Sequence, residues 1–497
     1  MRALAGLSFA VIIAFSPTSA LSQSAGDAQA LDLLAKHKAF VGWQFGDGTF
    51  QTMRITGNVA DEKGKQTETF VFLSDGLLYN DGFTELKRNG IVERDGFTGN
   101  LFWQSNYNGF TTPVYGNSAK FLASATILRN EGTTELPATY RGPKTIDDKQ
   151  TGIVRVTLKN GDPIDLYVDP STGAYVQAAT VDPDGTYETT YHIRSYQDVL
   201  PGKKMASSYT VDDGKSVTTF TKFEPNVPVT AQDIHPPAAL ASWTFGDGTP
   251  FPFTMTHDRM LVDATINGVK GRFLLDTGAD AIVLDDRFAD RAHAEVLNSS
   301  DQAYMISGEV KTRLRKVQTV TLGNSTLHDV VAFSQAVSPS EYGNDPRDQF
   351  DGFIGFDLFA GAVVKLNVYD GTMAILDPNT DLSSEKGLPI TVDLSQGTPI
   401  VPMILDNSTP VNAMLDTGSP GLIFFGPDLV SKYHFKVFAG CTNINTLSIG
   451  PIVYAGESAC QYGLSADYML IGFDFLRHFD FVFDYPHARM FMRPNKN

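Results

Sequence analysis

A three-residue motif that occurs twice in the second half of the chain constrains its fold more than any other feature. The first copy, Asp276-Thr277-Gly278, follows the apolar residues 273–275, and the second, Asp416-Thr417-Gly418, follows the apolar residues 413–415. A single Asp-Thr-Gly is weak evidence, because Asp and Gly gather in turns for backbone reasons alone. Two copies in the same apolar context indicate an internal duplication.

A second motif follows each copy and strengthens this interpretation. It reads Ile354-Gly355-Phe356-Asp357 in the first repeat and Ile471-Gly472-Phe473-Asp474 in the second. Each leads into a segment with the alternating pattern of a strand, at 363–369 and 479–485. The order of motifs is the same in both repeats, so the C-terminal half is predicted to consist of two similar lobes.

At these motifs the chain resembles the aspartic proteases, over about residues 255–497. The lobes are short, so the resemblance is to retropepsin-like units joined in one chain. It implies an all-β fold in which one Asp-Thr-Gly loop from each lobe meets the other at a pseudo-two-fold axis.

The chemistry of such a site explains why the motif should occur twice. Two carboxyl groups about 3 Å apart cannot both ionise, so they share one proton. The ionised carboxylate takes a proton from the attacking water, and the protonated one donates to the scissile carbonyl oxygen. Asp276 and Asp416 are therefore the candidate catalytic residues. Gly278 and Gly418 let the two loops approach without a Cβ clash.

The resemblance also implies roles for the neighbours of the two aspartates. Thr277 and Thr417 would hydrogen-bond across to the opposite loop and hold it rigid. Ser419 can donate a hydroxyl hydrogen bond to Asp416, whereas Ala279 offers no such donor to Asp276. A hydrogen bond to the charged form stabilises it, so we expect Asp416 to ionise first and Asp276 to keep the shared proton.

A protease of this family carries a flap hairpin that closes over the substrate. Residues 304–310, with Gly308 at the tip, fit this position in the first lobe, and residues 436–441 fit it in the second. Cys441 and Cys460 are the two cysteines of the chain, and they are expected to form one disulfide that tethers the second flap. This pair is too few ligands for a metal site, and no cofactor motif is present, so neither is expected.

The N-terminus, residues 1–22, is predicted to be a secretory signal peptide. Arg2 supplies the positive charge, residues 3–15 the apolar core, and cleavage is expected after Ala20 or Ser22. No later apolar stretch is long enough to span a membrane. The protein is therefore expected to be exported, either periplasmic or secreted. Its net charge of −17 argues against a nucleic-acid partner.

Residues 23–237 differ from the rest of the chain and are rich in short strands separated by turns. Strands are predicted at 69–73, 153–158, 164–168, 187–193 and 216–223, and helices at 31–40 and 118–129. This order loosely resembles the half-barrel of periplasmic lipoprotein-carrier proteins, which implies an apolar ligand on the concave face of the sheet. An accessory domain that only packs or scaffolds is the alternative. The segments 43–49 and 243–249 are nearly identical and predict a repeated strand and turn.

Together these observations predict a mainly β protein with a half-barrel-like domain followed by a two-lobed acid-protease-like fold. The predicted boundaries are 1–22 for the signal peptide, 23–237 for the N-terminal domain, 238–380 for lobe one and 381–497 for lobe two. The predicted function is that of a monomeric aspartic endopeptidase acting on peptides or proteins. The alternative is a non-catalytic protein that binds peptides or lipids with a protease-like fold.

Overall fold

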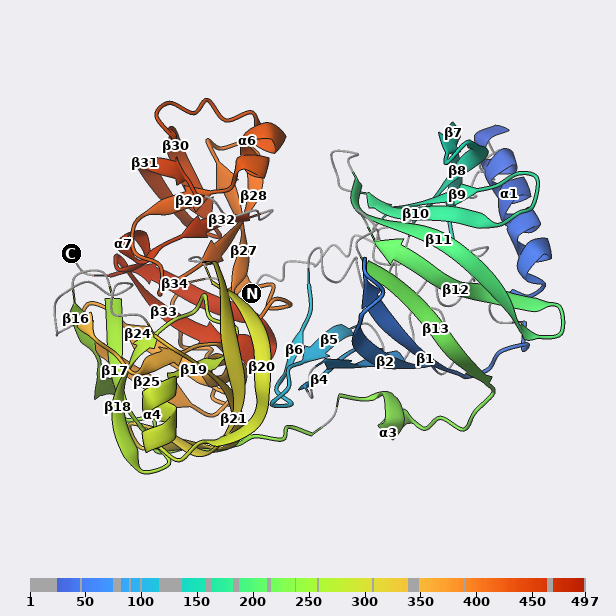
Figure 1. Ribbon diagram of the computed structural model, residues 1–497. Coiled ribbons are helices and arrows are strands. Elements are labelled where there is room, and N and C mark those ends of the chain that lie inside the picture. Colours follow the sequence, from blue (N-terminus) through green and yellow to red (C-terminus); the bar gives the residue numbers. More distant parts are fainter. Residues whose placement is uncertain are drawn as a thin grey trace, which may run out of the picture.

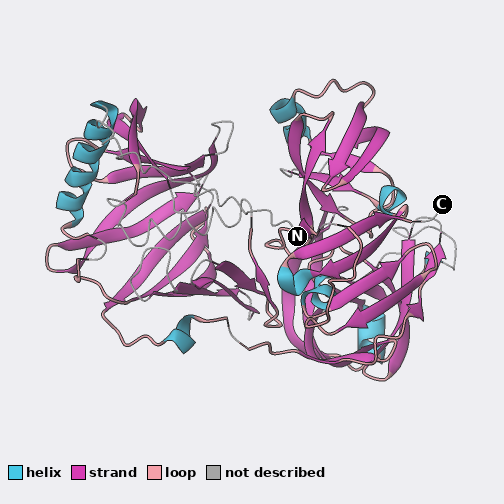
Figure 2. Cartoon of the chain, turned by 180° about the vertical axis from the view of Figure 1, so that it is seen from behind, coloured by secondary structure: helices cyan, strands magenta, loops and turns pink. Residues whose placement is uncertain are grey.

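The computed structural model describes most of the chain, and strands dominate it (Figures 1 and 2). The described residues are 25–44, 47–74, 82–88, 91–98, 101–115, 136–157, 163–181, 187–211, 216–236, 238–256, 259–305, 308–337, 348–387, 389–462 and 468–495. The predicted signal peptide and the predicted helix at 118–129 lie outside these residues. The mainly β fold class predicted from the sequence is confirmed.

One 13-stranded sheet forms the N-terminal domain, in the order β6-β5-β4-β3-β2-β1-β13-β12-β11-β10-β9-β8-β7. Its neighbouring strands pair antiparallel, and the sheet curves into a half-barrel (Figure 1). The five strand runs predicted from the sequence fall within β2, β8, β9, β11 and β13, except for residue 158, which lies outside the described residues. The strands are β1 (Met53–Asp61), β2 (Gln66–Ser74), β3 (Gly82–Arg88), β4 (Ile91–Thr98), β5 (Leu101–Ser105), β6 (Thr111–Pro113), β7 (Ala138–Ile146), β8 (Lys149–Thr157), β9 (Pro163–Val168), β10 (Tyr175–Val181), β11 (Tyr187–Leu200), β12 (Lys203–Val211) and β13 (Ser216–Pro225).

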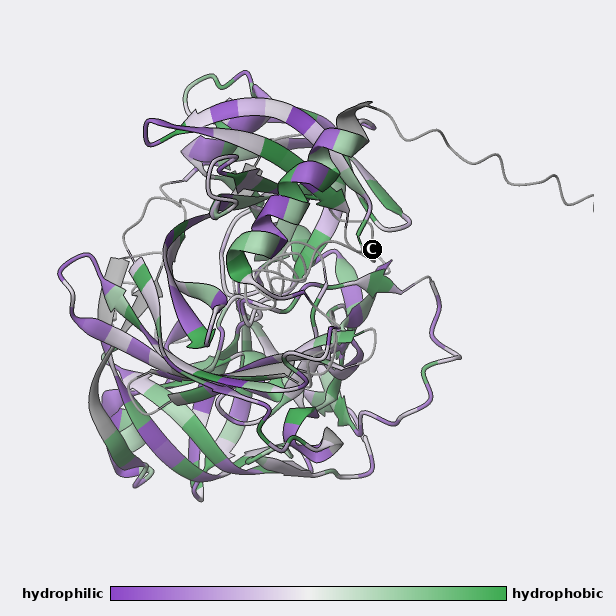
Figure 3. Cartoon of the chain, turned by 90° about the vertical axis from the view of Figure 1, so that its right-hand side faces the viewer, coloured by the Kyte–Doolittle hydropathy of each residue, from purple (hydrophilic) through white to green (hydrophobic). Residues whose placement is uncertain are grey.

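Helix α1 (Ala25–Val41) packs against β7, β8, β9 and β12, near one edge of this sheet. Its Leu33 and Leu34 are buried in the domain core, and hydrophobic and hydrophilic residues alternate along it (Figure 3). The helix ends at Val41. Gly42 follows it with a φ of 78°, the left-handed conformation that glycine adopts without a Cβ clash. The His37 ring stacks on Tyr175 with 3.4 Å between ring centroids, which fixes the helix against the sheet.

The two repeats form separate β structures joined by a shared sheet. The first repeat is a nine-stranded sheet in the order β14-β22-β19-β23-β18-β17-β21-β20, with β16 paired to β17. The second is a closed barrel in the order β27-β28-β32-β29-β31-β30. A six-stranded sheet, β15-β25-β24-β33-β34-β26, connects them because β24 of lobe one pairs with β33 of lobe two.

The elements of this half have the following bounds. The strands of lobe one are β14 (Ser242–Thr244), β15 (Phe251–Pro252), β16 (Thr254–Thr256), β17 (Arg259–Ile266), β18 (Val269–Leu275), β19 (Ile282–Asp285), β20 (Glu295–Met305), β21 (Gly308–Leu322), β22 (Ser325–Gln335), β23 (Gly352–Ile354), β24 (Val363–Asn367) and β25 (Thr372–Leu376). Those of lobe two are β26 (Ile390–Thr391), β27 (Ile400–Leu405), β28 (Thr409–Leu415), β29 (Ile423–Phe425), β30 (Cys441–Ile449), β31 (Ile452–Gln461), β32 (Tyr468–Ile471), β33 (Phe479–Asp484) and β34 (Arg489–Pro494). The helices are α3 (Ala231–Ile234) in the linker, α4 (Asp286–Arg291), α5 (Phe356–Ala360), α6 (Pro427–Tyr433), α7 (Phe473–Leu476) and the 3-10 turn η3 (Tyr485–His487).

The pairing of strands explains why the two motifs recur together. In lobe one β18, which leads into Asp276, lies parallel to β23, with Leu275 opposite Ile354. In lobe two β28, which leads into Asp416, lies parallel to β32, with Leu415 opposite Ile471. The Ile-Gly motif of each repeat therefore forms the neighbouring strand and the first helical turn behind the Asp-Thr-Gly loop.

The turn between β5 and β6 of the N-terminal domain lies against lobe one (Figure 1). Phe110 of this turn belongs to the hydrophobic core of the protease-like half and is only 7% exposed. A Cβ on Gly361 of lobe one would lie 2.5 Å from a ring carbon of Phe110 and 2.7 Å from Trp243 Nε1. The two parts of the chain are thus packed together through a shared apolar contact as well as through the linker.

The near-identical segments at 43–49 and 243–249 share a turn at residues 47–49 and 247–249, while residues 45–46 lie outside the described residues. Asp47 accepts a hydrogen bond from the backbone N–H of Thr49 at 2.8 Å, and Asp247 accepts one from Thr249 at 3.0 Å. In both copies the Asp side chain closes a turn over the following residues, which is a common structural use of Asp.

Candidate active site

The two Asp-Thr-Gly loops begin directly at the ends of strands β18 and β28. The backbone N–H of Asp276 donates to Ile354 O at 3.0 Å, and that of Asp416 donates to Ile471 O at 2.9 Å. Each candidate catalytic residue is therefore held by the buried isoleucine of the second motif in its own lobe.

The loops are interlocked through their threonines, both of which are buried. The Thr277 hydroxyl donates to Leu415 O at 2.6 Å, and the Thr417 hydroxyl donates to Leu275 O at 2.8 Å. Each hydroxyl oxygen also accepts the backbone N–H of the opposite threonine at 3.0 Å. Because every contact crosses between the lobes, the pair fixes the position of one loop relative to the other.

Gly278 and Gly418 lie face to face with the opposite carboxyl groups. A Cβ on Gly278 would lie 2.4 Å from Asp416 Cγ, and one on Gly418 would lie 2.3 Å from Asp276 Cγ. No side chain fits at these distances, so glycine is required at both positions by the approach of the carboxyl groups.

The two carboxyl groups share a hydrogen bond and have raised pKa values. Burial raises the pKa of Asp276 well above its usual range and the negative charge of Asp416 raises it further, while hydrogen bonds from the Gly278 and Ala279 N–H groups oppose the shift. Burial also raises the pKa of Asp416, but hydrogen bonds from the Gly418 N–H, the Asp276 carboxyl and the Ser419 N–H oppose this effect. Both carboxyl groups therefore favour a state in which the pair holds one shared proton.

The expected hydroxyl contact of Ser419 takes a different form. Its hydroxyl donates to Pro420 O at 3.4 Å, while its backbone N–H donates to Asp416 Oδ1 at 3.0 Å. The expectation that the hydroxyl stabilises Asp416 is thus not matched by these contacts, and the expectation that Asp416 ionises first stays a prediction.

A third carboxyl group, Asp357, lies directly behind the first loop and was not singled out as a site residue by the sequence. It is fully buried, and its carboxyl accepts the backbone N–H of Ile282 at 3.0 Å. Burial raises its pKa to about 6, although hydrogen bonds from Asn108, Ile282 and Tyr107 oppose this. In the sequence, Asp357 is marked only by its place in the repeated Ile-Gly-Phe-Asp motif, which indicates the duplication and does not by itself indicate a role in the site.

The raised pKa of Asp357 makes the stability of the folded protein depend on pH. The folded state favours the neutral acid, so its contribution to stability is present below the unfolded pKa of 3.8 and is lost as the pH rises through about 6. At neutral pH the buried charge costs about 3 kcal/mol of folding free energy. Stability alone therefore does not explain a carboxylate at this position.

The first lobe has the flap hairpin that the sequence predicted, and the second lobe does not have a matching one. Strands β20 and β21 pair up to Met305 opposite Gly308, so the hairpin lies at the predicted position, Gly308 begins β21, and the connecting residues 306–307 lie outside the described residues. In lobe two, Phe438 and Cys441 exchange backbone hydrogen bonds in a tight turn, and the hairpin β30–β31 turns between Ile449 and Ile452 instead. The second flap is thus a short turn, and the predicted disulfide with Cys460 holds its end.

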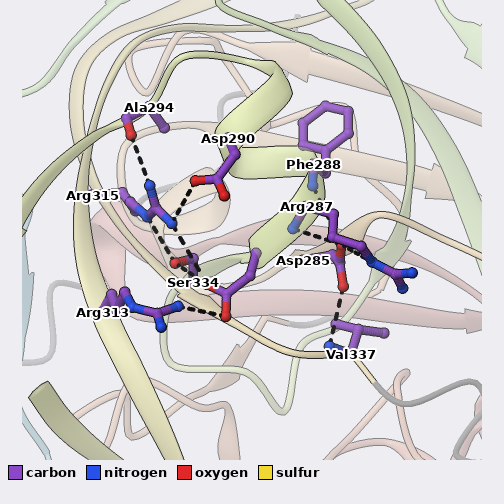
Figure 4. Close-up of polar contacts among 10 residues, drawn as sticks. Asp285, Arg287, Phe288, Asp290, Ala294, Arg313, Arg315, Ser334 and Val337 are labelled. Atoms are coloured by element: carbon purple, nitrogen blue, oxygen red, sulfur yellow. Dashed lines mark hydrogen bonds and ion pairs between the residues drawn. The ribbon is translucent and has the colours of Figure 1, made fainter. Parts of the chain in front are cut away.

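A cluster of charged side chains holds the outgoing flap strand β21 against helix α4 (Figure 4). The Arg315 guanidinium is buried, forms an ion pair with Asp290 at 3.0 Å and donates to Ser334 and to Ala294 O. Arg313 pairs with Asp286 at 2.6 Å. The short strand β19 separates helix α4 from the first Asp-Thr-Gly loop. The cluster therefore connects the base of the flap hairpin to the segment that follows Asp276.

The second half of the chain consists of two β-rich lobes whose Asp-Thr-Gly loops meet. Residues 262–358, from β17 through the first Asp-Thr-Gly loop to α5, match the family model described as aspartyl protease. This match confirms the predicted resemblance for that segment. Among curated protein sequences, none matches this chain.

Three solved structures are similar to parts of the chain. One is a DUF1329 family protein from Desulfovibrio piger, with 14% identity over 43% of this chain and 98% of its own and a TM-score of 0.32. The second is an outer membrane lipoprotein-sorting protein domain from Vibrio parahaemolyticus, with 8% identity over 42% and 96% and a TM-score of 0.31. The third is a LolA superfamily protein from Nitrosomonas europaea, with 14% identity over 41% and 97% and a TM-score of 0.32. At these TM-scores the likenesses support no inference about function.

Two further findings concern other kinds of site. Within the described ranges, no group of three or more His, Cys, Asp or Glu side chains is arranged to hold a metal ion. No helix of that same part of the chain has the length and apolar character needed to cross a membrane.

Removing the Thr277 hydroxyl should destabilise the protein. Thr277→Ala deletes the bond to Leu415 O and leaves the buried N–H of Thr417 without its acceptor. We expect a loss of about 2–3 kcal/mol in the free energy of unfolding, measured by denaturant titration. Thr277→Ser keeps the hydroxyl and should lose less than about 1 kcal/mol. Equal stability of the alanine variant and the wild type would mean that the loops are held by other contacts.

Removing the charge of Arg315 should also destabilise lobe one. Arg315→Met keeps much of the side-chain volume but loses the ion pair of a buried guanidinium with an exposed carboxylate and two hydrogen bonds, so we expect a loss of about 2–3 kcal/mol on unfolding. Arg287→Met is the matched control, because Arg287 is 79% exposed and pairs with Asp285 at 3.5 Å. Its effect should stay within about 0.5 kcal/mol. Equal effects of the two changes in denaturant titrations would contradict a structural role for the cluster.

Proposed function

We propose that this protein is an exported aspartic endopeptidase that hydrolyses peptide bonds with a water molecule activated by Asp276 and Asp416. The observation that carries the proposal is the interlocking of the two loops, which brings the half-buried carboxyl of Asp276 and the buried carboxyl of Asp416 into one hydrogen bond. The match of residues 262–358 to the aspartyl protease family supports the same reaction class.

The proposed mechanism assigns a different role to each carboxyl group. Asp416, the more readily ionised member, takes a proton from the attacking water as that water adds to the scissile carbonyl carbon. Asp276 donates the shared proton to the carbonyl oxygen, so a neutral tetrahedral intermediate forms. Collapse of the intermediate breaks the C–N bond as the proton now on Asp416 passes to the leaving amine, and Asp276 takes back a proton from a hydroxyl of the intermediate as the carbonyl of the product acid forms.

The intact dyad favours this enzyme over the alternative of a binding protein with a protease-like fold. Both loops keep their Asp, Thr and Gly, and the glycines are needed only because the carboxyl groups approach them so closely. Since one chain supplies both loops, the catalytic unit is proposed to be a monomer. Export is supported by the Cys441–Cys460 disulfide, which persists in oxidising compartments.

Single substitutions of the dyad test the proposal directly. Asp276→Asn and Asp416→Asn should each lower peptide hydrolysis by about a hundredfold or more, because each removes one proton-transfer group. Circular dichroism should show both variants folded. The control is Asp263→Asn, a change of an 84%-exposed carboxyl in the same lobe that should retain full activity. Cleavage of a denatured-protein library, with and without pepstatin, gives the readout, and full activity of either dyad variant would sink the proposal.

The pH dependence of hydrolysis follows from the raised pKa values. Activity should appear as the pH rises through the pKa of Asp416 and disappear as Asp276 loses its proton, so both limbs should lie above the ordinary range of Asp. Ser419→Ala should leave the acid limb in place, because alanine keeps the backbone N–H that contacts Asp416. An upward shift of the acid limb in the kcat/KM profile of Ser419→Ala would show instead that the Ser419 hydroxyl stabilises the charged form of Asp416.

A further inference from the structure

The turn 106–110 of the N-terminal domain supplies hydrogen-bond donors to a buried carboxyl group of lobe one. Asn106 and Asn108 each donate a side-chain N–H to Asp357 at 2.8 Å, and the Tyr107 hydroxyl donates to it at 3.2 Å. Asn108 is itself fully buried; its amide oxygen accepts the N–H of Val331 at 2.8 Å and its amide nitrogen donates to Val331 O at 3.0 Å. This turn therefore makes specific polar contacts with lobe one beside the apolar contact of Phe110.

The same carboxyl group reaches the catalytic loop from the other side. Asp357 accepts the N–H of Ile282, and the N–H of its neighbour Phe356 donates to Ala279 O at 2.9 Å. Ala279 and Ile282 lie three and six residues after Asp276 in the sequence. A continuous set of hydrogen bonds thus runs from the N-terminal domain through Asp357 to the segment that follows Asp276.

The second lobe lacks these features at the corresponding positions. Asp474 is 36% exposed and faces Arg477 at 3.7 Å. Arg477 and His478 stand where lobe one has Ala360 and Gly361, and Gly361 is the residue whose Cβ would clash with Phe110. The repeats therefore differ most where lobe one receives the N-terminal turn, which indicates that this contact is specific to one lobe.

We propose that Asp357 is a positioning residue for the first Asp-Thr-Gly loop and that the turn 106–110 supplies the hydrogen-bond donors that hold the Asp357 carboxyl in place. The N-terminal domain is then a permanent part of the protease, and its removal as a propeptide would leave a buried carboxylate without its donors. This inference rests on the proposed function for its effect on turnover. The claim about loop position stands on the hydrogen bonds alone.

Amide hydrogen exchange of the full-length chain tests the positioning without any need for turnover. Asn108→Ala should raise the exchange rate of residues 276–283 by about tenfold, because the loop loses its support from Asp357. Strand β30 of lobe two, which makes no contact with the Asp-Thr-Gly loop of lobe one through the interlocked threonines, is the internal control and should exchange as in the wild type. If the variant does not fold, Tyr107→Phe removes a single hydroxyl and should change the same segment by a smaller amount. Tyr115→Phe, at an exposed tyrosine just after β6, is the matched control. A folded variant with unchanged exchange at 276–283 would overturn the proposal.

Kinetics separate this inference from the proposed function. Asn108→Ala and Tyr107→Phe should lower kcat more than they change KM, because a displaced Asp276 stabilises the transition state less well while substrate binding is little changed. Tyr115→Phe should match the wild type in both constants. A wild-type protein without any peptidase activity would remove the proposed function, while the exchange result would still decide the role of Asp357. Normal kcat in a folded Asn108→Ala variant would overturn the positioning role.

Discussion

The hydrogen bonds between Thr277 and Thr417 are the interaction on which the rest of the site depends. They cross between the lobes, are buried, and fix the distance between two loops that belong to different parts of the chain. Because the loops cannot separate, the carboxyl groups of Asp276 and Asp416 are forced together away from bulk water. Their raised pKa values follow from this enforced proximity and burial, and so does the assignment of one group as acid and the other as base.

The duplication is not symmetrical, and each difference has a physical consequence. Lobe one carries the long flap β20–β21 and the charged cluster around Arg315, whereas lobe two has a short turn closed by a disulfide. Lobe one also receives the N-terminal domain on Asp357, whose counterpart in lobe two is partly exposed. The long hairpin and the contact with the N-terminal domain are therefore both concentrated on lobe one.

The sequence predicted those features that repeat and missed those that depend on distant contacts. The two Asp-Thr-Gly loops, the paired motif behind them and the disulfide are local patterns, so they were visible without a structure. The role of Asp357 was not, because its partners Asn106 and Asn108 lie about 250 residues away and form no recognisable motif. The Ser419 hydroxyl was assigned to Asp416 by analogy of position, but its direction depends on the carbonyl of Pro420, which a sequence does not place.

The central claim is that Asp276 and Asp416 share a single proton because the loops hold them together. Carbon-13 NMR of labelled aspartate carboxyl groups, followed over pH and assigned with the two single Asp→Asn variants, measures this sharing directly. We expect two coupled steps, with the upper step well above the ordinary pKa of Asp and both signals responding to each step. Two independent titrations, each near the ordinary value, would show that the carboxyl groups do not interact and would contradict the account.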